Sequence, residues 1–96
     1  MNQLEFEVIL KKALTKIEQH MVETPGFRPL ISIHKQIKYL IKLNNGEVDS
    51  SHLKDINVGL VVVREIENWD DELADLLHEI SDGVRVLIKT DELSCS

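Results

Sequence analysis

The sequence predicts an all-α protein folded as a small antiparallel four-helix bundle, with residues 51–67 as its central helix. Apolar residues recur at the three- and four-residue spacing of a helical face over most of the chain. Turn-forming residues interrupt that pattern at 24–26, 44–46 and 68–70. The segment 51–67 also holds the densest apolar run of the chain, at residues 60–63.

The first helix is expected over residues 4–22. Its charged side chains lie outside one apolar stripe, which is typical of a helix with one face on a core. The stripe consists of Phe6, Leu10, Ala13, Leu14, Ile17 and Met21. A turn is expected at 24–26, where the sequence reads Thr-Pro-Gly.

The second helix is expected over residues 28–43. Pro29 suits a first helical turn, and the sequence Asn-Asn-Gly at 44–46 is a strong stop signal. Five apolar residues make its core face, Leu30, Ile33, Ile37, Leu40 and Ile41. The opposite face is predicted to be a secondary contact surface, formed by Arg28, Ser32, Lys35, Gln36 and Tyr39. The alternative for Tyr39 is packing and hydrogen bonding on a neighbouring loop.

The third helix is expected over residues 51–67 and is predicted to be the most buried. Residues 49–51 are good N-cap types, and apolar residues then cover nearly the whole circumference of a helix. Gly59 permits close contact with another helix. A buried strand is the alternative for residues 60–63, because short β-branched runs also suit strands.

The fourth helix is expected over residues 71–88. Asp70 can cap its N-terminus, where the helix dipole also favours acidic residues. Its apolar stripe is Leu73, Leu76, Leu77, Ile80, Val84, Leu87 and Ile88. Its other face carries Asp71, Glu72, Asp75, His78, Glu79 and Asp82.

The composition is that of one globular domain spanning residues 1–96, with order expected over about 3–90. The apolar fraction is 43%, and no apolar run approaches the roughly 18 residues of a membrane span. The N-terminal residues lack the pattern of a signal peptide. Cys95 is the only cysteine, which fits a reducing cytoplasm.

The charge is unevenly distributed along the chain. Residues 1–48 carry seven Lys and Arg against five Asp and Glu, whereas residues 49–96 carry four against twelve. Between Glu65 and Asp82 there are eight acidic residues and no Lys or Arg. This pattern argues against nucleic acid and against an anionic membrane as partners, and favours a basic protein partner. The alternative is a face that is simply solvated.

The sequence predicts neither catalysis nor a bound metal or cofactor. The four histidines are scattered, and no phosphate-binding glycine loop, nucleophile elbow or Cys/His pair is present. The paired carboxylates of the fourth helix are expected on an open face, where nothing excludes water or perturbs a pKa. An enzyme is therefore the least favoured class of protein.

Four short motifs resemble a known family: Pro25-Gly26-Phe27, Leu30-Ile31-Ser32, Lys35-Gln36-Ile37 and Tyr39-Leu40. Together with Gly59 and the acidic break into Glu72-Leu73, they resemble type VI secretion immunity proteins that neutralise NAD(P)+ glycohydrolase effectors. The resemblance spans about residues 4–88. It implies an all-α cytoplasmic protein without enzymatic activity, which binds a toxin domain 1:1 and blocks its active site.

The toxin-facing surface is predicted at the acidic break and the start of the fourth helix. It comprises Glu67, Trp69, Asp70, Asp71, Glu72 and Asp75. Trp69 is the only tryptophan, and Trp is enriched among the residues that dominate interface energies. The alternative for Trp69 is a lid on the core between the third and fourth helices. The alternative function is a helical interaction module or complex subunit with no toxin partner.

Overall fold

The computed structural model describes residues 3–66 and 69–94. Every element in these ranges is helical, so the predicted fold class is confirmed. In chain order the elements are α1 (Gln3–Glu23), α2 (Arg28–Asn44), η1 (Leu53–Asp55), α3 (Val58–Val61), η2 (Val62–Ile66) and α4 (Asp71–Ser94). The observed bounds of α1, α2 and the start of α4 agree with the sequence prediction to within one residue, but the predicted end of the fourth helix at residue 88 is wrong, because α4 continues to Ser94.

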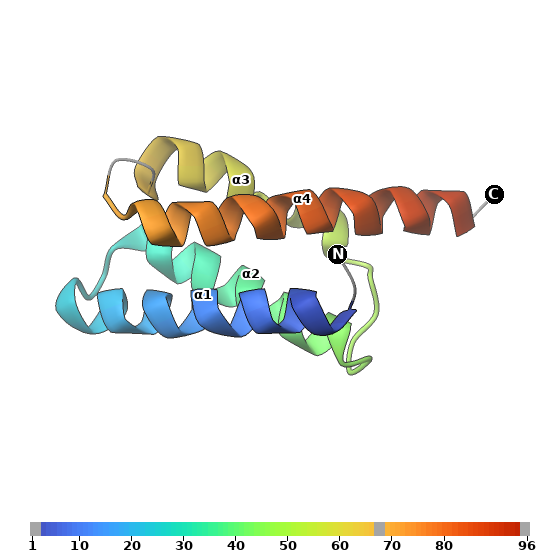
Figure 1. Ribbon diagram of the computed structural model, residues 1–96, viewed down its shortest axis with the longest axis horizontal. Helices are drawn as coiled ribbons and strands as arrows, with labels where there is room; N and C mark the ends of the chain where they lie inside the picture. Colours follow the sequence, from blue (N-terminus) through green and yellow to red (C-terminus); the bar gives the residue numbers. More distant parts are fainter. Residues whose placement is uncertain (1–2, 67–68, 95–96) are drawn as a thin grey trace.

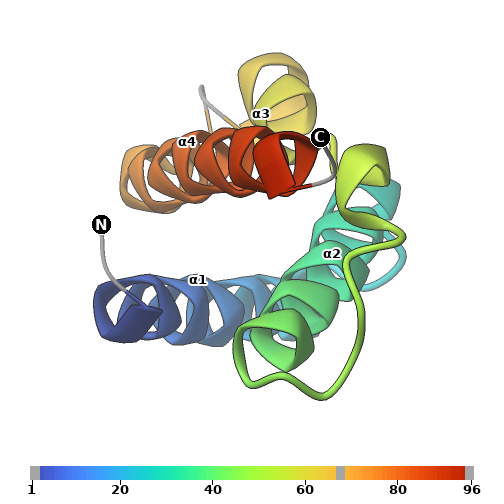
Figure 2. The same ribbon diagram turned by 90° about the vertical axis from the view of Figure 1, so that its right-hand side faces the viewer.

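Successive helices run in opposite directions (Figure 1). Viewed end-on, α1 packs beside α2 and α4, and α3 lies beyond α4 on the side away from α1 (Figure 2). The loop from α1 to α2 and residues 69–70, which precede α4, lie at the same end of the bundle, where Phe27 contacts Trp69 (Figure 1). The candidate site lies at this end, where residues distant in sequence come together.

The core lies mainly between α1, α2 and α4. Fully buried side chains come from each of these three helices, because each carries an apolar stripe at helical spacing. The largest of them are Leu10, Ile17, Leu30, Ile33, Ile37, Leu40, Leu73, Leu77 and Ile80. The apolar stripes predicted from the sequence are therefore the faces that pack together.

Helix α2 ends at the predicted stop signal, and the hydrogen bonds show why. The Glu47 N–H donates to the Lys42 carbonyl at 2.9 Å, and the Gly46 N–H donates to the Leu43 carbonyl at 3.1 Å. This pair of bonds is a Schellman motif, which needs a left-handed residue after the helix. Gly46 supplies it with φ 77°.

The prediction of one continuous helix over 51–67 is wrong. The chain forms the 3₁₀ turn η1, breaks at Ile56 and Asn57, and then forms the short α3, which continues as the π-helical turn η2. Residues 49–51 do not cap an α-helix: the Asp49 carboxylate instead accepts hydrogen bonds from the Ser51 N–H and hydroxyl. The carbonyl of Asn57 accepts the first backbone hydrogen bonds of α3, from Leu60 and Val61.

The segment 51–67 is also not the central helix. Val58 and Ile66 are fully buried, but Leu60 is 53% exposed because α3 packs on the outside of α4. The predicted role of Gly59 is confirmed: a Cβ at this position would lie 2.5 Å from the Ser81 Oγ of α4. An apolar residue within an all-round apolar pattern can therefore still be exposed, as Leu60 is. The side chains of Val62 and Val63 lie outside the described residues.

Candidate functional site

Four carboxylates form one exposed stripe along α4. Their spacing of four, four and three residues places them on the same side of the helix, and each is exposed. Arg85 lies beside the far end of the stripe, with its Nη1 3.7 Å from the Asp82 carboxylate. We call this surface the acidic stripe, Asp71, Asp75, Glu79 and Asp82.

Trp69 lies at the N-terminal end of the acidic stripe and contacts two other elements. Its ring centroid is 4.3 Å from that of His20 on α1 and 5.5 Å, edge-on, from that of Phe27 in the α1–α2 loop. The side chain nevertheless remains 42% exposed. Trp69 thus packs over the end of the bundle and still presents an accessible edge.

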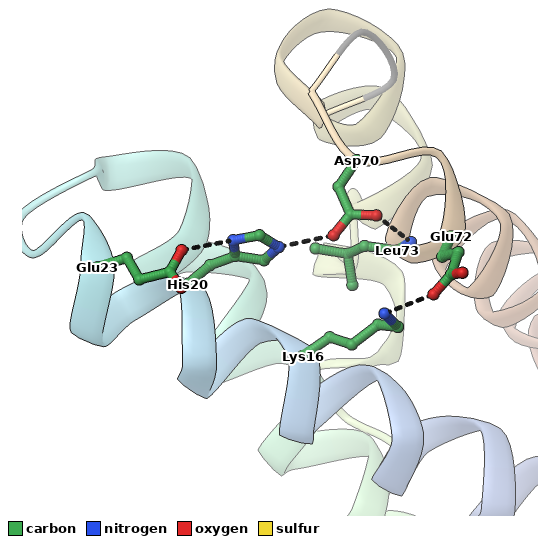
Figure 3. A network of polar contacts seen from close by, with 6 residues as sticks. All are labelled: Lys16, His20, Glu23, Asp70, Glu72 and Leu73. Carbon is green, nitrogen blue, oxygen red and sulfur yellow. Dashed lines mark hydrogen bonds and ion pairs between the residues drawn. The ribbon is translucent and has the colours of Figure 1, made fainter.

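Asp70 uses both carboxylate oxygens within the chain (Figure 3). Oδ1 accepts a hydrogen bond from the Leu73 N–H at 3.1 Å, so the predicted cap of α4 is confirmed. Oδ2 lies 2.6 Å from the Nε2 of His20. Partial burial raises the pKa of Asp70, but the hydrogen bonds from His20 and Leu73 outweigh it, and the net pKa lies below the usual 3.8.

The lowered pKa of Asp70 predicts a contribution to acid stability. A carboxyl group whose pKa is lower in the folded state stabilises the fold above its ordinary pKa, and this contribution disappears as pH falls below about 4. We expect Asp70→Asn to reduce the difference in unfolding free energy between pH 6 and pH 3. Urea titrations at several pH values measure the free energy of unfolding of both proteins. Parallel pH profiles for the two proteins would contradict the prediction.

A second ionic contact joins α1 to α4 one turn further along. The Nζ of Lys16 lies 2.7 Å from the Glu72 carboxylate, and this hydrogen bond is the main reason that the pKa of Lys16 is raised (Figure 3). Glu72 is 80% exposed, so it faces α1 without being enclosed. Glu72 therefore contributes to the contact between helices and lies at the edge of the acidic surface.

The structure brings five of the six predicted site residues together at this end of the bundle, and Glu67 lies outside the described residues. Trp69, Asp71 and Asp75 are each exposed, whereas Asp70 is engaged in capping and in its contact with His20. Sequence reasoning missed His20, Phe27 and Lys16. No periodic signal marks them, because they approach Trp69 and α4 only through the packing of α1 and of the α1–α2 loop.

The predicted secondary surface on α2 is largely engaged within the chain. Gln36 donates to the Asn57 side chain at 2.7 Å and accepts from the Asn57 N–H at 2.9 Å, which fixes the start of α3. The Tyr39 hydroxyl donates to the Asp49 carbonyl at 2.7 Å, as the alternative for this residue anticipated. Arg28 and Lys35 are exposed on the outer face of α2.

An open groove of about 810 Å³ lies between α3 and α4. Its lining combines apolar and polar side chains, Ile56, Asn57, Gly59, Leu60, His78, Ser81, Asp82 and Arg85. Among the described residues, no group of three or more His, Cys, Asp and Glu side chains is arranged to hold a metal ion. None of the described helices has the length and apolar character needed to cross a membrane.

A comparison with known protein families identifies the family of this chain. The model of the Tsi6 family matches residues 6–85, most of the sequence. The chain belongs to the Tsi6 family. Tsi6 is a family of type VI secretion immunity proteins, so the resemblance stated from the sequence motifs is confirmed at that level. No curated protein and no solved structure matches the chain.

The acidic stripe and Trp69 have properties that bear on protein binding. Membership of an immunity family implies a toxin protein as the partner. The acidic stripe offers a negative potential to a basic surface, and the exposed edge of Trp69 offers apolar area beside it.

Proposed function

We propose that this Tsi6 protein binds a cognate secreted antibacterial toxin, an NAD(P)+ glycohydrolase, and blocks its active site. It would act in the cytoplasm of the producing cell, as a 1:1 inhibitor without enzymatic activity of its own. The observation that carries the proposal is the acidic stripe with Trp69 at its end. A glycohydrolase of this class must hold the pyrophosphate of its dinucleotide, so its cleft tends to be electropositive.

We further propose that the toxin cleft receives the end of the bundle at which Trp69 and the first carboxylates of the acidic stripe lie. The α1–α2 loop and the first turn of α4 lie at this end of an elongated bundle (Figure 1). The end of a bundle can enter a cleft more deeply than the side of a helix can. The residues proposed to face the toxin are Trp69, Asp71, Glu72 and Asp75, with Glu67 added from the sequence. Arg28 and Lys35 on α2 are proposed as a secondary contact, and Ser32, Gln36 and Tyr39 as its supports.

The test uses the toxin domain encoded by the neighbouring gene. We expect co-purification at 1:1 and loss of NAD+ hydrolysis when one equivalent of this protein is present. Asp71→Asn/Asp75→Asn/Glu79→Gln should slow association about tenfold at low salt, and the difference should shrink as salt is added. A matched control removes three exposed acidic residues elsewhere, Glu18→Gln/Glu47→Gln/Asp55→Asn.

Two results would contradict the proposal. Full NAD+ hydrolysis by a toxin that is bound to this protein would show that binding does not block the active site. Equal association rates for the stripe variant and the control would place the interface elsewhere. Absence of any toxin partner would favour the alternative, a helical interaction module.

A further inference from the structure

We propose that His20 of α1 is a positioning residue for the toxin-binding surface: through its contacts with Asp70 and Trp69, it fixes Trp69 in the orientation that the toxin recognises. The inference rests on the proposed function. It adds to the surface a residue that is 50 positions away in sequence and need not touch the toxin. Figure 3 shows His20 reaching from α1 to Asp70 at the start of α4.

His20 holds the η2–α4 loop through two different kinds of contact. Its Nε2 lies 2.6 Å from the Asp70 carboxylate, and its ring lies 4.3 Å from that of Trp69, at an angle of 44°. These contacts act on neighbouring residues of one loop. One imidazole ring therefore restrains both the backbone position at Asp70 and the side-chain position of Trp69.

The orientation of the imidazole ring is set by Asp70 rather than by α1. Among residues 3–66 and 69–94, its Nδ1 is buried without a hydrogen-bond partner, and the Glu23 carboxylate on α1 is 3.9 Å away, beyond hydrogen-bond distance. The carboxylate of Asp70 is an acceptor, so Nε2 carries the donated proton. Since the other oxygen of Asp70 accepts from the Leu73 N–H, the carboxylate is held between α1 and α4.

This arrangement matters for binding because a fixed anchor loses less conformational freedom when a partner docks. His20 has a side chain that is 21% exposed, and the Asp70 side chain is 18% exposed, so water competes little for their contact. The exposed part of this unit is the edge of Trp69. Removing the contact between His20 and Asp70 frees the loop without removing the surface that touches the toxin.

The test is a double-mutant cycle in toxin affinity. His20→Phe retains a ring against Trp69 but removes the hydrogen bond to Asp70, and we expect the Kd to rise about tenfold. In a Trp69→Ala background the same change should raise the Kd by less than about threefold, because the anchor is already gone. When affinities refer to folded protein, a role in fold stability alone would leave the Kd unchanged by His20→Phe in both backgrounds.

A control and a second measurement accompany the cycle. His34→Phe changes a histidine of similar burial on α2, whose nearest carboxylate is 3.9 Å away on Glu18, and should leave affinity unchanged. Trp69 is the sole tryptophan, so quenching of its emission by acrylamide reports its accessibility directly. We expect His20→Ala to increase that quenching.

The outcomes separate the inference from the proposed function. If the wild-type protein does not bind the toxin domain, the proposed function is overturned, and this inference with it. Suppose that the wild-type protein and its Trp69→Ala variant behave as expected while His20→Phe leaves binding unchanged. That result would overturn the positioning role alone. Equal effects of His20→Phe in both backgrounds would also overturn it.

Discussion

Trp69→Ala is expected to weaken toxin binding by about 2 kcal/mol, or roughly thirtyfold in Kd. The side chain is half-exposed at the end of the acidic stripe, where an aromatic edge can enter the toxin cleft. The effect should lie in the dissociation rate, because it removes short-range contact and leaves the charges in place. Surface plasmon resonance with the toxin domain measures both rates.

Trp69 also packs against His20 and Phe27, so Trp69→Ala should lower the free energy of unfolding by about 1 kcal/mol. Trp69→Phe is the matched control, since it preserves an aromatic ring and should recover part of both effects. Lost stability together with unchanged affinity would mean that Trp69 is purely a lid on the bundle. The outer face of α2 would then become the leading candidate for the interface.

Gly83→Val is expected to destabilise the fold by about 3 kcal/mol, at the upper end of the usual cost of overpacking. A Cβ at Gly83 would lie 2.7 Å from Cε1 and 3.1 Å from Cδ1 of Phe6, so ring and helix cannot both stay in place. Phe6 is 6% exposed, which leaves little space into which its ring can move. Gly83→Ala should also destabilise, although Ala normally stabilises a helix by about 1 kcal/mol relative to Gly.

Two controls isolate the clash. Asp82→Val places the same side chain at an exposed neighbouring position of α4 and should cost less than 1 kcal/mol. Phe6→Leu/Gly83→Ala should be more stable than the sum of its single changes predicts, because the smaller side chain makes room for the new methyl group. Additive effects in urea unfolding would show that the contact between α1 and α4 is not the cause.

The sequence alone determined the bounds of α1 and α2 and the start of α4. The spacing of apolar residues predicts α1, α2 and α4, since a helix that packs on one side must repeat its buried residues every three or four positions. Local chemistry sets their ends: Gly46 supplies the left-handed residue after α2, and Asp70 caps α4. These signals are local, so they can be read without knowing what lies beside each helix.

The tertiary structure decided the form of the segment 51–67. Its apolar residues satisfy a helical pattern, but contacts from α2 fix the chain before α3 begins. Tyr39 binds the carbonyl of Asp49, and Gln36 binds both the N–H and the side chain of Asn57. These tethers lie ten or more residues apart in sequence, so a periodicity argument cannot detect them.

The residues of the candidate site were also determined partly by the sequence and partly by the tertiary structure. The charge pattern of the sequence placed the acidic residues and Trp69 at the start of α4, because an uncompensated run of carboxylates is visible in the sequence itself. Only the packing of α1 against α4 brings His20 to Asp70 and Trp69, across 50 residues of chain. Composition and periodicity fix which side chains a helix exposes, whereas the contacts that hold a loop in place depend on which helices meet.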